Sequence, residues 1–206
     1  MRPVNEIVRL VDSQVAQAGA LLARAFQDDP LSAYTVPDPA ERARVMPGFY
    51  ARMIRFGVIA GEVYTTAGAM EGVAVWLPPD VQWTRERIQA AGLHELSNLV
   101  GADAIARYRE VVGLEAQARE RDMTEPYWYL LLLGVEPARQ RRGLGGALIT
   151  PILERERRTG HLCYVETENP RNVAFYGRHG FELIIDGQAA GKTGVRFWTF
   201  KRPAKP

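Results

Sequence analysis

The chain has 206 residues, of which 47% are hydrophobic and 24% charged, and these values are ordinary for a globular protein with a sizeable core. The net charge of +2 does not indicate a nucleic-acid surface, and the single cysteine excludes an internal disulfide framework. No apolar run is long enough for a membrane span, and the charged first residues argue against a signal peptide. We therefore expect a cytoplasmic protein, a monomer or homodimer, without nucleic-acid or membrane partners.

The first third of the chain alternates between predicted helices and strands. A helix beginning at Asp12 or Ser13 has an apolar stripe at helical spacing, and prolines interrupt the segment that follows it. Alternating apolar residues around Gly68 predict a hairpin. We thus expect a strand at 4–11, a helix from 12 or 13, a loop at 31–38, a helix at 41–59 and strands at 61–66 and 72–77.

The next segment, residues 84–121, has a helical pattern. Thr84 can cap a short helix over 85–91, and Asp103 can begin a longer helix that continues through Arg119. This helical insertion precedes an apolar strand beginning at Tyr127. It could form a lid over a substrate site, or it could be a packed helical pair without such a role.

The strand from Tyr127 leads into a basic, glycine-rich turn, Gln140-Arg-Arg-Gly-Leu-Gly-Gly146, and the residues after that turn are helical in pattern. The free N–H groups and the dipole of a helix N-terminus favour anions, and arginines add forked donors. No lysine follows the glycines, which excludes a P-loop, and Leu148 occupies the place of the last glycine of a dinucleotide fingerprint. The turn therefore predicts a pyrophosphate site of another kind.

A second segment follows a predicted strand at 162–166. Asn169 can cap a helix whose first residue is Pro170, and Gly180 suits the left-handed position that ends it. Asn172 and Tyr176 are four residues apart and share one face of this helix. The chain then closes with predicted strands at 181–186 and 195–201.

These two segments, Q-x-x-G-x-G preceded by Val135-Glu-Pro137 and N-x-x-x-Y-x-x-x-G-F, resemble the conserved segments of the GNAT acyltransferase superfamily. The resemblance implies an α/β fold in which helices flank a central mixed sheet. We expect a single domain over 1–206, with the helical insertion at about 84–121. Residues 29–38 and the run V-A-V-W-L-P-P resemble, less specifically, the puromycin-acetyltransferase-like branch.

The resemblance implies direct transfer of the acetyl group of acetyl-CoA, the co-substrate, to an amine. A small-molecule acceptor such as an antibiotic or a metabolite is the leading hypothesis. The alternatives are a peptide or protein N-acetyltransferase and a non-catalytic module that senses acetyl-CoA. The resemblance assigns acetyl-CoA contacts to Leu133, Gly134, Val135, Gln140, Arg141, Arg142, Gly143, Leu144, Gly145, Gly146, Asn172 and Tyr176.

Tyr176 matches the tyrosine that in this superfamily serves the leaving thiolate as an acid, although it could instead only pack against the cofactor. Glu166 is the candidate base, and Glu168, two residues on, should face the same side of the strand. Either could act directly or through a water molecule. Cys163 would permit an acyl-cysteine route, but a small buried strand residue is the simpler interpretation. No spacing predicts a metal site.

The acceptor site is less clearly specified by the sequence. In this superfamily the segment after the first helix often lines it, which makes Tyr34 a candidate contact, although a partly buried loop tyrosine explains it as well. Aromatic side chains near the predicted sheet could line a pocket for a compact molecule or could belong to the core. The candidates are Tyr34, Trp76, Tyr127 and Tyr129.

Overall fold

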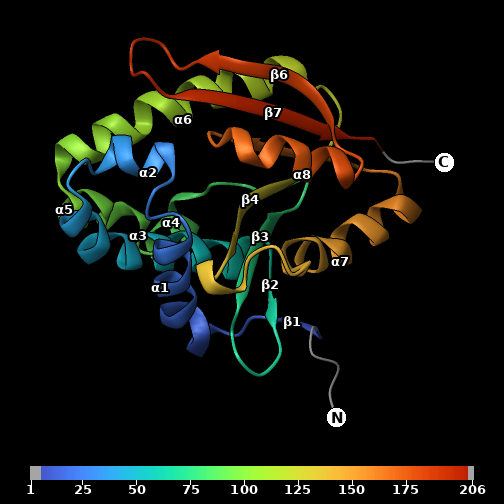
Figure 1. Ribbon diagram of the computed structural model, residues 1–206, viewed down its shortest axis with the longest axis horizontal. Helices are drawn as coiled ribbons and strands as arrows, with labels where there is room; N and C mark the ends of the chain where they lie inside the picture. The colour runs from blue at the N-terminus through green and yellow to red at the C-terminus, as the bar shows by residue number, and fades with distance from the viewer. Residues whose placement is uncertain (1–5, 204–206) are drawn as a thin grey trace.

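A seven-stranded mixed sheet forms the centre of the computed structural model, which describes residues 6–203 (Figure 1). The strands lie in the order β1-β2-β3-β4-β5-β7-β6, and only the neighbours β4 and β5 are parallel. They are β1 (Ile7–Arg9), β2 (Glu62–Thr66), β3 (Gly72–Leu77), β4 (Tyr127–Val135), β5 (Leu162–Thr167), β6 (Glu182–Ala189) and β7 (Arg196–Arg202).

Helices cover both faces of the sheet (Figure 1). They are α1 (Val15–Ala25), α2 (Pro30–Thr35), α3 (Pro39–Ala60), α4 (Arg85–Ala90), α5 (Leu96–Val100), α6 (Ala102–Asp122), α7 (Leu144–Thr159) and α8 (Val173–Arg178). Within the described part of the chain, no helix has the length and hydrophobicity that crossing a bilayer requires.

The alternation of side chains along β3 shows how the two faces are filled. Val73 and Val75 join the core formed with α1 and α3, whereas Ala74 and Trp76 join the core beneath α7 and α8. Successive strand residues point to opposite faces, so a strand covered on both sides is apolar at every position. The continuous run Gly72–Leu77 is accordingly buried throughout.

Helix α6 belongs to the body of the protein. Val111 and Ala118 pack against Ile185 and Phe197, which lie on β6 and β7. In Figure 1 the helix runs alongside this pair of strands. One side of α6 is thereby packed against β6 and β7, and Arg119 from the same helix reaches Glu166 on β5.

The two parallel strands separate before either of them ends. Their pairing stops at Tyr129 opposite Tyr164, although β4 continues to Val135 and β5 to Thr167. A shift in the β3–β4 register leaves Leu131 as an extra residue in β4 at this point. Bulges bend strands and are frequent beside active sites. The separation leaves an unpaired backbone edge of β4 in the middle of the sheet.

The fold confirms the predicted α/β class and the predicted helix at 41–59, and strands form at the predicted hairpin, central and C-terminal positions. Gly160 and Gly180 adopt the left-handed conformation, with φ of 88° and 80°. One expectation is wrong: Pro30–Thr35 is a helix, capped by Asp29 with proline at its first position, rather than part of a loop. The first predicted strand is shorter, and its start at Val4 lies outside the described residues.

Candidate active site

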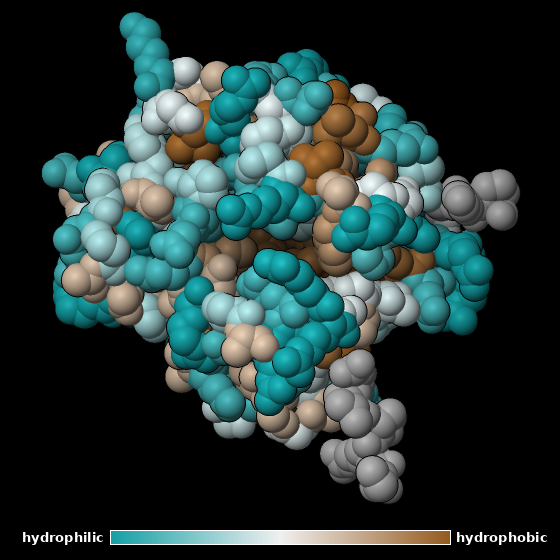
Figure 2. Space-filling view, in the orientation of Figure 1, coloured by the Kyte–Doolittle hydropathy of each residue, from teal (hydrophilic) through white to brown (hydrophobic). Residues whose placement is uncertain are grey.

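A groove of about 790 Å³ lies along the unpaired edge of β4, between the glycine-rich turn and α8. Such a volume falls within the usual range for ligand sites. In the space-filling view, an apolar strip is recessed between two hydrophilic rims near the centre of this face (Figure 2). The predicted residues that line the groove are Leu133, Gly134, Val135, Gln140, Arg141, Gly143, Leu144, Gly145, Gly146 and Asn172.

The turn before α7 has the backbone of an anion-binding site. Arg141 and Gly143 adopt left-handed conformations with φ of 60° and 81°, and Arg141 is the only non-glycine described residue with positive φ. No side chain caps the start of α7, so the N–H groups of its first turn are available to a ligand. Successive N–H groups in such turns form a concave cradle for anions. The groove therefore fits a pyrophosphate.

The two later glycines of the turn also have a packing role. A Cβ atom at Gly146 would lie 2.5 Å from His179 Nε2, and one at Gly145 would lie 3.3 Å from the Phe175 ring. Both neighbours belong to the α8 segment. These glycines thus allow α8 to approach α7 closely, which narrows the groove between them.

Several arginines make the groove basic, and the sequence analysis did not include all of them. Arg24 and Arg139 are engaged by Glu136 and Glu71, whereas Arg171 and Arg178 form no ion pair with a described residue. Arg142, which we predicted as a contact, is exposed and lies outside the lining. Arg171, in the 3-10 turn Pro170–Asn172, and Arg178, at the end of α8, both lie within the second sequence segment, and that placement could have indicated them.

A second, smaller cavity of about 110 Å³ adjoins the groove where β4 and β5 separate. The lining of both spaces includes Phe26, Asp29, Leu133 and Asn172. Four carboxylates line the small cavity, from Asp29, Glu115, Glu166 and Glu168, and no lysine, arginine or histidine does so. The two spaces therefore meet but have opposite charge.

Glu166 is the most constrained of these carboxylates. Arg119 Nη1, from α6, donates to its two oxygens at 2.8 and 2.9 Å, and the Tyr129 hydroxyl donates to Oε2 at 2.7 Å. Arg119 also lies over the Tyr129 ring, 4.6 Å from its centroid. Burial raises the pKa of Glu166, and Arg119 opposes this rise by favouring the anion.

The other carboxylates have fewer partners. Among the described residues Oε1 of Glu115 is buried without a partner, and Glu115 lies close enough to Glu168 for the two carboxyl groups to share a proton. Burial, then repulsion by Glu168, raises the pKa of Glu115 to about 12. Burial followed by Glu168 likewise raises the pKa of Asp29 to about 7, although the N–H groups of Ser32 and Leu31 favour its anion.

Tyr176 lies on α8 and faces the small cavity. It is 4% exposed, and its ring packs against Phe175, Phe181 and Phe200. Burial raises its pKa, and Glu168 and Asp29 raise it further. The hydroxyl thus keeps its proton at neutral pH. Tyr176 lines the small cavity rather than the groove, whereas Asn172 lines both.

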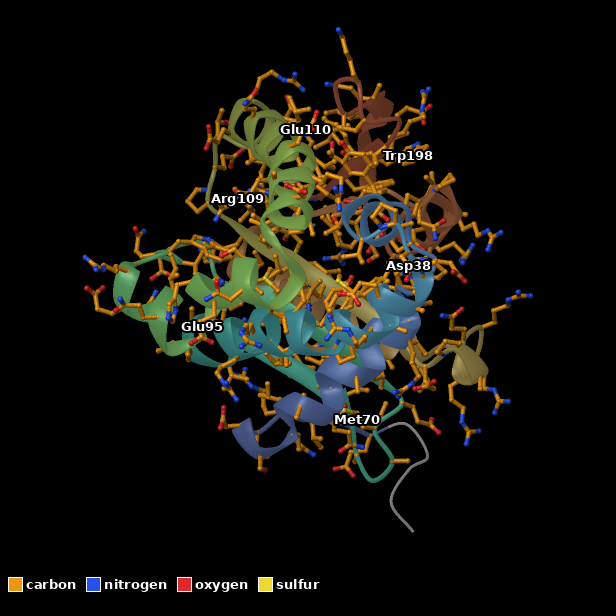
Figure 3. All side chains as sticks on the ribbon, turned by 90° about the vertical axis from the view of Figure 1, so that its left-hand side faces the viewer. Asp38, Met70, Glu95, Arg109, Glu110 and Trp198 are labelled. Carbon is orange, nitrogen blue, oxygen red and sulfur yellow. The ribbon has the colours of Figure 1, made fainter. Side chains whose placement is uncertain are left out.

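Only one of the predicted acceptor contacts, Tyr129, lines the small cavity. Trp76 is fully buried in the core, and Tyr127 packs against Tyr164. Tyr34 is partly buried against the cluster that α6 forms with β6 and β7, and its hydroxyl donates to Glu110, which Figure 3 labels on α6, at 2.9 Å. These three side chains contribute to packing and lie outside both spaces.

Cys163 and metal chemistry have no support from the geometry. Cys163 is fully buried, and burial raises the pKa of its thiol to about 12, so the reactive thiolate is disfavoured. Across residues 6–203, no three His, Cys, Asp or Glu side chains are grouped to hold a metal ion.

Sequence reasoning missed Asp29, Glu115 and Arg119, which come from helices α2 and α6. One signal was available: Glu115 is four residues after Val111 and three before Ala118, so it interrupts an apolar stripe. A carboxylate in such a stripe must be buried or must face a cavity. The pairing of Arg119 with Glu166 depends on the tertiary fold and had no such signal.

Comparisons with known proteins agree with this geometry. A family model described as the acetyltransferase (GNAT) domain matches residues 99–183, which span the end of the insertion and both conserved segments. An uncharacterised N-acetyltransferase of Schizosaccharomyces pombe is 27% identical over 176 residues, covering 80% of this chain and 69% of that protein.

Two solved structures are similar over nearly their whole length. A Corynebacterium glutamicum protein, described as a histone acetyltransferase and related acetyltransferase, gives a TM-score of 0.70 at 20% identity, with 97% of each chain covered. An agmatine N-acetyltransferase gives a TM-score of 0.59 at 19% identity, with 96% of this chain and 98% of that one covered. These likenesses show a shared fold.

Proposed function

This chain belongs to the GNAT acetyltransferase superfamily and is an acetyl-CoA-dependent acyltransferase, and we propose that it acetylates an amine of a small molecule by direct transfer. The observation that carries the proposal is the meeting of a basic groove with an acidic cavity beside Tyr176 and Asn172. The groove suits the phosphates of acetyl-CoA, and the cavity suits a cationic amine.

A small acceptor fits this cavity better than a folded protein does. Its volume of about 110 Å³ is enclosed largely by side chains of α2, α3, α6, β4 and β5. The structurally similar agmatine N-acetyltransferase acts on a small amine by its description. A peptide N-terminus remains the alternative, and it would have to enter as a single extended residue.

Acetyl-CoA supplies an acetyl thioester, and we assign its placement to backbone and side chains on either side of the groove. Leu133, Gly134 and Val135 offer the unpaired edge of β4 to the pantetheine arm as if to another strand. The turn from Arg141 to Gly146 holds the pyrophosphate. Asn172 Nδ2 donates to Thr167 Oγ1 at 2.9 Å, which fixes its orientation at the junction of the two spaces.

Tyr176 is the proposed acid. The amine nitrogen forms a bond to the thioester carbon, and breaking of the C–S bond then places negative charge on sulfur. A phenol that stays protonated can donate a hydrogen bond to this thiolate or transfer its proton. Because burial raises the pKa of Tyr176, stabilisation by the hydrogen bond is the larger part of this role.

A carboxylate at the end of β5 is the proposed base, because an ammonium acceptor must lose a proton before it attacks. The contacts favour Glu168 over the predicted Glu166. Both oxygens of Glu166 already accept hydrogen bonds from Arg119 and Tyr129, whereas Glu168 is near enough to Tyr176 to raise its pKa. Glu166, acting through water, is the alternative. Tyr129 and Arg119 are positioning residues in either case.

Substitution Tyr176→Phe tests the proposal. We expect kcat for CoA release with an amine to fall by about 10²- to 10⁴-fold, while acetyl-CoA affinity stays close to that of the wild type. Tyr64→Phe, which removes a hydroxyl on β2 bonded to Glu62, is the matched control. Wild-type turnover by Tyr176→Phe would contradict the acid role. If the wild-type protein binds acetyl-CoA but no added amine causes it to release CoA, the protein is a sensor.

Several sequence predictions stay predictions at this point. They are the cytoplasmic location, the monomeric or homodimeric state, the single-domain boundaries and the puromycin-acetyltransferase-like branch.

A further inference from the structure

Glu115 has an unusual position for a carboxylate. It is 4% exposed, it lines the small cavity, and its Oε1 has no hydrogen-bond partner among residues 6–203. A buried carboxylate without a partner is costly, and such groups are normally paired. The proposed acetyl transfer does not use Glu115, so another role must account for it.

The surrounding charges indicate what is missing. Arg119, one helical turn along α6, is committed to Glu166, and Glu168 lies close enough to Glu115 to repel its negative charge. A single acceptor ammonium near Tyr176 would offset only one of the three remaining carboxylates, Asp29, Glu115 and Glu168. The reacting amine therefore leaves carboxyl groups of the lining without a cationic partner, and protons offset their repulsion in its place.

The shape of the cavity restricts the molecule further. Its volume of about 110 Å³ is smaller than the roughly 150 Å³ cavity that accepts a benzene ring. A narrow aliphatic chain fits such a space, and a nucleoside or another bulky ring system does not. Apolar side chains such as Leu31 and Val112 line it together with the carboxylates, which suits a chain of methylene groups.

We propose that the acceptor is a linear amine with a second cationic group, an ammonium or a guanidinium, and that Glu115 binds this distal group. The inference rests on the proposed function and adds the acceptor class and a specificity-determining residue. In the empty cavity, a proton held between Glu115 and Glu168 offsets their repulsion. When the distal cation binds Glu115, that proton leaves to solvent and the cation replaces it.

This assignment gives the helical insertion a definite task. Helix α6 is anchored on β6 and β7 by Val111 and Ala118, and the same helix contributes Glu115 and Arg119 to the centre of the molecule. Figure 3 shows α6 from the side on which Glu110 is labelled. In this proposal the helix forms one wall of the acceptor site.

The test is a set of matched acceptors: α,ω-diaminoalkanes, alkylamines of the same length and the corresponding amino alcohols, assayed by CoA release. A charge-assisted hydrogen bond contributes about 1.5 to 3 kcal/mol. We therefore expect the best diamine to have a kcat/KM about 10- to 150-fold above that of the alkylamine of the same length. The diamine value is first halved, because a diamine has two equivalent amines. The neutral amino alcohol should behave like the alkylamine.

The variant Glu115→Gln keeps the shape of the side chain and removes its charge, and we expect it to reduce this ratio to about 3 or less. Glu120→Gln, an exposed position on the same helix, is the control with the same loss of charge, and it should keep the wild-type ratio. The thermal shift produced by acetyl-CoA reports whether each variant retains its fold.

Each other outcome overturns a different statement. Equal kcat/KM for diamines and alkylamines in the wild type would refute the dicationic acceptor and leave the proposed function intact. A wild-type preference that Glu115→Gln preserves would refute the role of Glu115. Failure of every amine to release CoA, despite binding of acetyl-CoA, would overturn the proposed function and this inference with it.

Discussion

The groove and the small cavity meet beside Tyr176, yet they are built in different ways. The groove is lined by one continuous stretch, from Leu133 to Gly146, which we propose binds through its main-chain groups, and its added charge is positive. The cavity is lined by side chains from distant segments, including Asp29, Glu115 and Glu168, and its charge is negative. In the proposed function the basic wall serves the co-substrate and the acidic wall serves the acceptor.

This difference has a consequence for substitutions. Main-chain contacts survive most side-chain changes, so single substitutions in the groove should weaken binding only in part. Carboxylates in a closed cavity are coupled by their burial, and the loss of one alters the others. We therefore expect larger effects on the acidic side than on the basic side.

The largest expected effect is that of Glu168→Gln. Loss of a general base should lower kcat/KM by about 10²- to 10⁴-fold near neutral pH. The defect should shrink as the pH approaches the pKa of the amine, near 10 for an alkylamine, since the free amine no longer needs a base. Glu120→Gln again controls for the lost charge.

The same pH profiles, measured for Glu166→Gln, decide between the two carboxylates. A pH-dependent loss confined to Glu166→Gln would return the role of base to Glu166. In that case Glu166 would act as the base while it accepts the hydrogen bonds of Arg119 and Tyr129.

A smaller effect concerns the stability of the fold. Burial raises the pKa of Asp29 to about 7, above its value near 4 in an unfolded chain, so the folded protein holds this proton more tightly. The stabilisation from this proton is complete below pH 4 and is lost as pH rises through 7. Asp29→Asn, which still caps α2, should raise the free energy of unfolding relative to the wild type by about 2 kcal/mol above pH 7.

Denaturant unfolding of both proteins from pH 4 to 8 measures this difference. A gap between wild type and Asp29→Asn that stays constant over this range would show that Asp29 titrates as it does in the unfolded chain.

The smallest expected effect is in the groove, at Arg141. Arg141→Gly removes a guanidinium and also the cost of a left-handed non-glycine residue, φ 60°. We expect the free energy of unfolding to change by no more than about 1 kcal/mol, while acetyl-CoA affinity falls about tenfold. Calorimetric titration with acetyl-CoA checks the second number. An affinity loss of about a thousandfold would mean that this side chain, and not the backbone, dominates phosphate binding.

The same contrast explains which parts of the site the sequence could predict. The turn at 140–146 and the helix with Asn172 and Tyr176 are local, so spacing predicted their backbone form, and the resemblance to the GNAT superfamily supplied the roles of their residues. The acceptor side depends on how α2 and α6 pack against β4 and β5, and the spacing of residues along the sequence cannot predict that packing. Tyr34 and Trp76 illustrate the limit, because an aromatic residue near a sheet has the same sequence signal in a core as in a pocket.

The central claim is direct transfer at the junction of the two spaces, and two-substrate initial-rate kinetics tests it most directly. Varying acetyl-CoA against a diamine should give intersecting double-reciprocal lines, with one acetylated amine formed for each CoA released. Parallel lines would indicate a covalent acetyl-enzyme. Such a result would contradict the account, because Cys163 is buried outside both spaces and direct attack of the amine on the thioester carbon beside Tyr176 would no longer be the route.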